Sequence, residues 1–375
     1  MDFSSLYRRI TAIYSAVPRK LSRGYAFPPL QVFIELTRRC NLRCVMCQNL
    51  PYMEQMSPPD EKKEELTLEE LVRIISETPR FALITFTGGE PLLRSDFEQI
   101  LKYTSERRRC HVITNGVLLD EEMARLMVAC GAKRLFGRGL IFVGVSVHGP
   151  AQLHDRITQL EGSFTKATDA ARRIAEIKAE RRTKLPFLYL CTVLTRETVE
   201  TLPDMVQIAH DVSADIFNIT LRITSLDLSI VHGATMETML RYPRAPDRIE
   251  GGLLREKLSE TLRRCSELGM QIRLPRMPIS EIANYYAGKW SPSGYTCQAP
   301  WAKTFISPHG SVYACHQLEV GSLREKPLKA IWNNANYRRF RQELKRHKAF
   351  PICAACCEIE HPARTNQRDH LACSH

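Results

Sequence analysis

The stretch Gln31–Cys47, which reads QVFIELTRRCNLRCVMC, decides the fold of this protein. It begins with Val32–Leu36, a short apolar run rich in β-branched and aromatic residues, which is typical of a buried strand. Three cysteines follow within eight residues, at Cys40, Cys44 and Cys47. Thiolates on a loop that leaves a strand can converge on one point, and such soft ligands favour zinc or an iron–sulfur cluster. The sequence therefore predicts a metal site directly after the first strand.

The number of ligands separates the two kinds of metal site. A closed structural zinc site takes four ligands, whereas this loop offers three cysteines and no histidine stands nearby in the sequence. Three cysteines on a four-iron cluster would leave one iron open to a substrate or a cofactor. Because the loop follows the carboxyl end of a strand, where parallel α/β folds place their active sites, this open iron is a candidate catalytic centre.

From the first strand to about residue 235, strand-like runs alternate with helical patterns. Five further strands are predicted, at Ala82–Phe86, His111–Thr114, Ile141–Val147, Phe187–Leu194 and Ile216–Ile223. Capping boxes at Thr67–Glu70 and Ser95–Glu98 open two of the helices between them, and further helices open at Asp120 and Ser163. This alternation predicts a parallel sheet of the α/β class. Periodicity alone leaves open whether six such units close partly into a barrel or lie open as a doubly wound sheet.

The composition excludes several classes of protein. The chain has 375 residues, of which 44% are hydrophobic and 25% are charged, so it is neither disordered, collagen-like nor a coiled coil. The net charge of +12 would attract anionic partners, but no basic run alternates with aromatic residues, which disfavours a nucleic-acid partner. The 13 cysteines lack the frame of a small secreted domain. With no signal peptide or membrane span predicted, we expect a cytoplasmic protein.

Two further motifs extend the pattern of the cysteine loop. Thr87-Gly-Gly-Glu-Pro91 follows the second predicted strand, and Thr114-Asn-Gly116 follows the third. Together with the C-x3-C-x2-C loop they resemble the radical S-adenosylmethionine (SAM) enzymes, whose loop has an aromatic residue at the position of Met46. The resemblance implies a partial (β/α)6 TIM-like barrel. It also implies a [4Fe–4S] cluster held by the three cysteines, with SAM bound at its open iron.

The resemblance also implies which residues meet SAM. Glycines allow a backbone to approach a ligand closely, and an arginine is a bidentate donor for the SAM carboxylate, although a structural role for this arginine is the competing interpretation. His148 follows the fourth strand and is a candidate for proton transfer near neutral pH. The expected SAM contacts are Met46, Gly88, Gly89, Glu90, Asn115, Ser146 and Arg222.

A second set of cysteines lies near the C-terminal end, at Cys297, Cys315, Cys353 and Cys356. Four thiolates suit zinc and an iron–sulfur cluster equally well. Beside the first set, the pattern resembles the twitch domain, a shorter relative of the SPASM domain, and implies an auxiliary [4Fe–4S] cluster. Ligation by four cysteines leaves no open iron, which favours electron transfer. Only Cys357 and Cys373 lie beyond, too few for a second auxiliary cluster.

The chemistry that the resemblance implies is reductive cleavage of SAM to a 5′-deoxyadenosyl radical. That radical takes a hydrogen atom from a small-molecule or peptide substrate, and an electron donor such as flavodoxin or ferredoxin supplies the electron. Oxidation of an alcohol and cross-linking or epimerisation of a peptide stay open as net reactions. The lack of a peptide-recognition domain in the first 30 residues argues mildly against leader-dependent peptide work. The alternative function is a zinc-stabilised nucleic-acid-binding protein without SAM chemistry.

The sequence suggests five segments. A basic leader at 1–30, with an amphipathic pattern at Leu6, Ile10, Ile13 and Tyr14, precedes the radical SAM barrel at 31–235. A bridge at 236–296 contains a helix at Gly252–Leu268 and a strand at Met270–Leu274. The twitch-like module spans 297–360, and a tail at 361–375 ends the chain.

Overall fold

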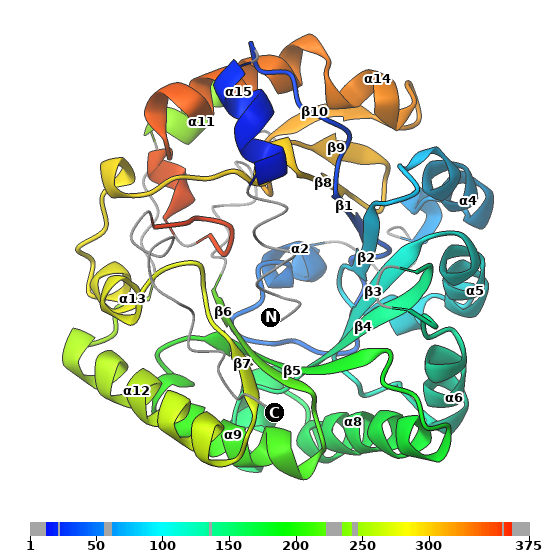
Figure 1. The fold of residues 1–375 in the computed structure, drawn as a ribbon, viewed down its shortest axis with the longest axis vertical. Helices are drawn as coiled ribbons and strands as arrows, with labels where there is room; N and C mark the ends of the chain where they lie inside the picture. Colours follow the sequence, from blue (N-terminus) through cyan, green and yellow to red (C-terminus); the bar gives the residue numbers. More distant parts are fainter. Residues whose placement is uncertain are drawn as a thin grey trace.

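The structure, a computed structural model, describes residues 13–21, 23–55, 62–134, 137–222, 235–241, 247–354 and 356–361. A single curved sheet of ten strands organises it (Figure 1). The strand order is β10-β9-β8-β1-β2-β3-β4-β5-β6-β7. The strands are β1 Gln31–Glu35, β2 Leu83–Thr87, β3 Arg109–Thr114, β4 Gly139–Ser146, β5 Phe187–Leu194, β6 Ile216–Leu221, β7 Gln271–Arg273, β8 Lys303–Ile306, β9 Ser311–Tyr313 and β10 Glu319–Ser322.

The strands from β1 to β7 pair in parallel in sequence order, as a chain of β-helix-β units requires. The predicted parallel sheet is therefore confirmed. Figure 1 shows that the sheet wraps around the centre of the molecule and that α4, α5, α6, α8, α9 and α12 lie along its outer side. This is the partial barrel that the resemblance implied. We call the concave interior of the sheet the lumen.

Helices follow most of the strands. The principal helices of the barrel are α2 Leu50–Gln55, α4 Leu68–Glu77, α5 Phe97–Arg107, α6 Glu121–Ala129, α7 Ala151–Thr158, α8 Ser163–Glu180 and α9 Leu202–Asp211. The later helices are α11 Met236–Arg241, α12 Gly251–Glu267, α13 Ile279–Tyr286, α14 Leu328–Trp332 and α15 Ala335–His347. The helix over residues 13–21 covers only Ile13 and Tyr14 of the amphipathic leader pattern, and Leu6 and Ile10 lie outside the described residues.

Local capping explains where these helices begin. Thr67 and Glu70 form the predicted capping box of α4, and the Asp120 carboxylate accepts a hydrogen bond from the Met123 amide at the start of α6. The predicted box at Ser95 is wrong, because α5 begins at Phe97 after Asp96, which makes no side-chain cap. The Asp96 carboxylate instead binds the guanidinium of Arg94 at 2.7 and 2.8 Å.

The sheet contains strands from the barrel segment, the bridge and the cysteine-rich C-terminal segment, which the sequence analysis had separated. β7, from the bridge at 236–296, pairs with β6, and β8, from the cysteine-rich C-terminal segment, pairs in parallel with β1. β9 and β10 continue beyond β8 in antiparallel order. The barrel segment and the cysteine-rich C-terminal segment thus share one sheet. In the described part of the chain, no helix has the length and apolar character needed to cross a bilayer.

Candidate active site

The cysteine loop leaves the carboxyl end of β1 with its three thiols half-buried. Backbone amides approach the sulfurs: the Leu42 N–H donates to Cys40 Sγ and the Asn49 N–H donates to Cys47 Sγ, both at 3.4 Å. Amide hydrogen bonds of this kind stabilise the thiolate ligands of iron–sulfur clusters. The loop backbone is therefore arranged to receive cysteines in their deprotonated, metal-bound form.

Burial shapes the proton affinity of these thiols. It raises the pKa of Cys40 to about 11 and the pKa of Cys44 to about 12. Repulsion from the neighbouring thiols of the loop adds to both increases. The thiols therefore hold their protons at neutral pH unless a metal replaces them, so without a metal they are not free nucleophiles. Three such donors on one loop fit a [4Fe–4S] cluster with one iron left open.

The Gly-Gly-Glu-Pro loop lies directly against the cysteine loop. The Gly89 N–H donates to the Thr37 carbonyl at 2.7 Å, and the Glu90 N–H donates to the Arg39 carbonyl at 2.9 Å. A Cβ on Gly88 would lie 2.2 Å from the Thr37 oxygen, and one on Gly89 would lie 2.1 Å from the Arg39 oxygen. The two glycines are thus needed for contact between the loops, a reason that the sequence did not reveal.

Glu90 joins the second loop to the third. Its fully buried carboxylate accepts hydrogen bonds from the Leu92 amide, the Thr114 hydroxyl and the Asn115 amide at 2.7–3.0 Å. Burial raises the pKa of Glu90 to about 7 despite these donors. Asn115 then reaches back, with Nδ2 2.8 Å from Asn41 Oδ1 and 3.7 Å from Cys40 Sγ. The three motifs form one connected structure, in which Glu90 holds the loops together.

Met46 anchors the cysteine loop to α7. The side chain is 7% exposed and packs against Leu153 and Ile157. The adjacent Val45 amide donates to the Ile157 carbonyl at 2.9 Å, and the Arg43 amide donates to the carbonyl at the end of the same helix at 3.1 Å. The methionine therefore serves the packing of the loop.

Two predicted residues lie at and just beyond the end of β4. Ser146 is half-buried on the lumen side. His148 is buried, and its Nδ1 accepts from the Val193 amide at 3.4 Å. Burial, with the neighbouring His154, lowers the pKa of His148 to about 3. The imidazole is therefore neutral at physiological pH, which disfavours the proton transfer near neutral pH that the sequence suggested.

Arg222 follows β6 and already has a carboxylate partner. Its Nη1 lies 2.8 and 2.9 Å from the two oxygens of Asp247. Arg222 Nε is buried and has no hydrogen-bond partner among the described residues. The structure thus brings Arg222 to the site as a paired side chain with one free donor.

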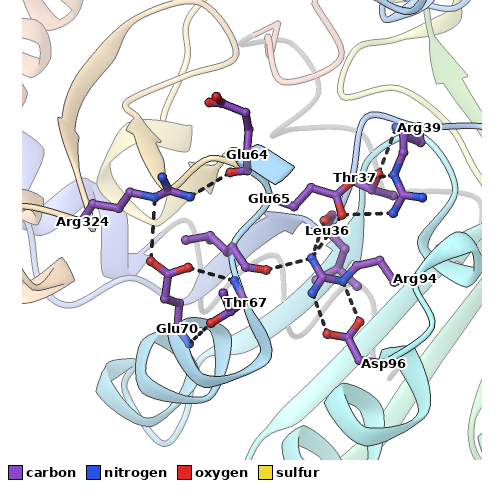
Figure 2. A network of polar contacts seen from close by, with 11 residues as sticks. Leu36, Thr37, Arg39, Glu64, Glu65, Thr67, Glu70, Arg94, Asp96 and Arg324 are labelled. Carbon is purple, nitrogen blue, oxygen red and sulfur yellow. Dashed lines mark hydrogen bonds and ion pairs between the residues drawn. The ribbon is translucent and has the colours of Figure 1, made fainter. Parts of the chain in front are cut away.

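A polar network below the cysteine loop links β1 to the start of α4 and α5 (Figure 2). Glu65 is 8% exposed and accepts from the Arg39 guanidinium at 2.9 and 3.0 Å and from the Thr37 hydroxyl. Arg94 Nη1 lies 3.6 Å from Glu65 and donates to the Leu36 carbonyl at 3.1 Å. Sequence reasoning did not find Glu65, because no local pattern connects it to the cysteine loop 25 residues earlier.

The four cysteines of the C-terminal set, Cys297, Cys315, Cys353 and Cys356, line one apolar cavity. The Phe350 amide donates to Cys353 Sγ at 3.4 Å, and the Glu358 amide donates to Cys356 Sγ at 3.5 Å. Four thiols around one cavity, with amides directed at two sulfurs, fit a fully ligated cluster. Cys357 is outside the cavity lining and lies against Cys356 and His316, and Cys373 lies outside the described residues.

A buried ion pair connects this cavity to β8, the strand that pairs with β1. Glu358 lines the cavity, and Lys303 Nζ on β8 lies 2.7 and 2.8 Å from its two oxygens. Burial alone would raise the pKa of Glu358, but the charges of Lys303 and Arg276 hold it at about 2. In the sequence, Lys303 stands in a short apolar stretch, but the sequence alone does not show which carboxylate pairs with it.

Comparison with known proteins matches a family model to each of the two regions that carry the cysteine sets. The Radical SAM superfamily profile matches residues 34–209, and that of an iron–sulfur cluster-binding domain, SPASM, matches residues 297–357. PqqA peptide cyclase of Granulibacter bethesdensis is 30% identical over 320 residues, which cover 82% of this chain and 75% of that protein. The AdoMet-dependent heme synthase of Methanosarcina barkeri is 26% identical over 344 residues, covering 88% and 91% of the two chains.

Solved structures agree on the fold. SuiB of Streptococcus suis has a TM-score of 0.62 at 14% identity, over 95% of this chain and 78% of that one. The matched profiles imply SAM, a [4Fe–4S] cluster and auxiliary iron–sulfur ligation as the cofactors of an enzyme, and nothing in the comparisons supports the zinc-stabilised nucleic-acid-binding alternative. The chain belongs to the radical SAM superfamily and carries a C-terminal SPASM iron–sulfur cluster-binding domain.

Proposed function

We propose that this enzyme modifies a peptide by radical chemistry and that its SPASM domain passes an electron during turnover. The observation that carries the proposal is the placement of two cysteine sets on one sheet, three at the carboxyl end of β1 and four around a cavity that begins beside β8. The peptide substrate is supported by similarity to PqqA peptide cyclase over 82% of the chain.

The residues that would hold the first cluster are Cys40, Cys44 and Cys47. When bound, the reduced cluster supplies the electron that cleaves SAM and so generates the radical that removes a hydrogen atom from the substrate. Asn115 and Ser146 face the same region and would line the SAM pocket, together with the backbone of Gly88 and Gly89. Met46, Glu90 and Arg222 would act indirectly, by packing or bonding the loops that surround SAM. His148 has no proton-transfer role in this proposal.

Cys297, Cys315, Cys353 and Cys356 would hold the auxiliary cluster, with all positions of the cluster ligated. A site without an open iron suits electron transfer and not substrate binding. The thiol ligands require a reducing compartment such as the cytoplasm, and the electron donor would be a flavodoxin or a ferredoxin.

A second candidate substrate class is a tetrapyrrole. It is favoured by the AdoMet-dependent heme synthase of Methanosarcina barkeri, of which this chain covers 91%. Product analysis by mass spectrometry, with a peptide in one assay and a porphyrin in another, separates the two classes.

Iron content and SAM cleavage under anaerobic, reducing conditions test the proposal. We expect about eight irons per reconstituted chain, four for each site. Cys40→Ala should abolish formation of 5′-deoxyadenosine, and Cys353→Ala should lose about half of the iron and retain some cleavage but no product. Cys265→Ala, at a buried cysteine of α12 outside both sites, is the matched control. Full iron content in Cys40→Ala would refute the assignment of the first site, and unchanged turnover in Cys353→Ala would remove the auxiliary cluster from the reaction.

A further inference from the structure

Four side chains form a continuous belt across the lumen side of four neighbouring strands. Ser146 pairs in register with Cys191, Cys191 with Asn218, and Asn218 with Arg273. Side chains alternate between the two faces of a strand, and the preceding residues on these strands, Val145, Leu190, Phe217 and Ile272, are buried in the core under the outer helices. We call Ser146, Cys191, Asn218 and Arg273 the lumen belt.

The lumen belt lies at the level of the SAM loops. Val145 pairs with Thr114, so Ser146 follows at the height of Asn115, whose amide nitrogen is 3.7 Å from Cys40 Sγ. Within the belt, Asn218 Nδ2 lies 3.5 Å from Cys191 Sγ. A substrate that approached the SAM pocket from inside the barrel would therefore meet the belt.

Arg273 brings an uncompensated positive charge to this surface. It is exposed, and among the described residues no hydrogen bond or ion pair is found for it. Burial lowers the pKa of His111 on β3 to about 3 and raises the pKa of Cys191 on β5 to about 11, and the charge of Arg273 adds to the first shift and opposes the second. It also adds to the factors that lower the pKa of Lys303 on β8. The charge of Arg273, whose residue pairs in register with Asn218 of the belt, thus acts on groups of three strands around the lumen.

The neighbouring cations differ from Arg273 because each already has a carboxylate. Lys303 binds Glu358, Arg276 binds Glu360, and Arg222 binds Asp247. The carboxylates of Glu358, Glu360 and Asp247 are therefore already paired with other cations. Arg273 is left with its planar fork of donors, which matches the two oxygens of a carboxylate.

An aromatic surface lies below the belt. The ring of Phe142 contacts Tyr189 at a centroid distance of 5.1 Å and His111 at 5.6 Å. Gly144 leaves room above these rings, because a Cβ there would lie only 3.3 Å from Cys191 Sγ. Apolar walls reduce the local dielectric constant, so an ion pair at Arg273 would be stronger here than on an open surface.

We propose that Arg273 binds a carboxylate of the substrate inside the lumen, so that the enzyme prefers a substrate that carries an acidic group there. This inference rests on the proposed function, since it takes the lumen as the place where the peptide is bound. It adds the charge and the chemical group that the enzyme recognises, and it assigns Arg273 as a residue that determines specificity.

Two capped tripeptides that differ in one group test the proposal, Ac-Ala-Glu-Ala-NH2 and Ac-Ala-Gln-Ala-NH2. Their binding to the reconstituted enzyme with SAM is measured by calorimetry. Wild-type enzyme should bind the Glu peptide about tenfold more tightly than the Gln peptide, as expected for a hydrogen-bonded charge pair. Arg273→Gln should abolish this preference, and Arg273→Lys should keep part of it. Arg255→Gln, at an exposed arginine of α12, is the matched control and should behave as wild type.

Charge reversal gives a second, independent readout. Arg273→Glu should prefer Ac-Ala-Lys-Ala-NH2 over the Glu peptide, which a merely unfolded variant cannot do. Equal binding of the Glu and Gln peptides by the wild type, or a preference that survives in Arg273→Gln, overturns the proposal. Formation of 5′-deoxyadenosine by the wild type without peptide tests the proposed function separately, so cleavage without a carboxylate preference would overturn only the role of Arg273.

Discussion

Gly89 shows how a single hydrogen atom can determine the position of a metal-binding loop. A methyl group at this residue would overlap the Arg39 carbonyl, 2.1 Å away. Since the obstacle is backbone, the cysteine loop itself would have to move. We predict that Gly89→Ala destabilises the fold by about 1–3 kcal/mol and lowers the iron content of the first site. Urea unfolding and iron analysis measure the two effects.

The matched control is Gly294→Ala, where a Cβ meets no atom within 4 Å. If Gly89→Ala bound iron and unfolded as this control does, the close approach between the loops would have no consequence for the site.

His148 provides a prediction about pH. Burial keeps its pKa at about 3, below the ordinary value of 6.5. Between these values the unfolded chain binds a proton that the folded chain does not, so the free energy of unfolding decreases as pH falls through this window. For one histidine the slope is about 1.4 kcal/mol per pH unit.

Urea unfolding at about pH 7.5 and about pH 5.5 measures this loss. His148→Asn should lose less stability than wild type over that interval, because it removes the group that titrates. Parallel losses in the two proteins would mean that the imidazole is not held in its neutral form.

At this scale the sequence indicated candidate metal ligands more readily than the residues that support them. Cysteine spacing predicted a first set on the loop after β1 and a second set that lines one cavity, and the ligand roles of both sets stay predictions. The spacing did not indicate that the Glu90 carboxylate accepts hydrogen bonds from three protein donors, because those donors come from residues 92–115 and reach Glu90 only in the folded chain.

Among the elements, the network around Glu65 connects the cysteine loop to two helices (Figure 2). We predict that Glu65→Gln destabilises the protein by about 3 kcal/mol, because it leaves Arg39 and Arg94 without the charge that they share. The variant should also bind iron less completely at the first site.

Glu64→Gln is the matched control. Figure 2 shows the Glu64 carboxylate directed away from Arg324, which instead binds the Glu64 backbone carbonyl at 2.8 Å. Equal unfolding midpoints for the two variants would contradict a structural role for the Glu65 network.

Elements were predicted where their signal is local. The capping box at Thr67 is complete within four residues and was confirmed. The box at Ser95 failed because Arg94 takes the neighbouring Asp96 carboxylate for an ion pair. Helix propensity alone does not predict an ion pair such as the one between Arg94 and Asp96.

At the scale of the molecule, the Lys303–Glu358 pair ties β8, the strand of the C-terminal segment that pairs with β1, to the wall of the cysteine cavity. Both groups are buried, and the pair lies within 2.8 Å. We predict that Lys303→Met lowers the free energy of unfolding by about 3–5 kcal/mol, because it leaves an uncompensated buried carboxylate. Lys257→Met, at a lysine on the surface of α12, is the control.

The double variant with Glu358→Gln should recover part of that loss, and a double-mutant cycle in urea measures the recovery. Strictly additive effects of the two substitutions would show that the pair is not a coupled unit.

The alternation of strands and helices was enough to predict a parallel sheet, because each strand and its following helix are formed by consecutive residues. The contact between β1 and β8 was not predictable in this way, since Gln31 and Lys303 are far apart in the chain and no periodicity specifies a sheet edge.

That contact has a consequence for protein engineering. Because β8 completes the hydrogen bonding of β1, the auxiliary-cluster region is not an exchangeable cassette. A chimera that replaced it would uncover the edge of the very strand from which the cysteine loop starts. A foreign cluster domain grafted onto this barrel would therefore need a strand that can pair with β1, so that the strand that leads into the cysteine loop keeps its hydrogen bonds.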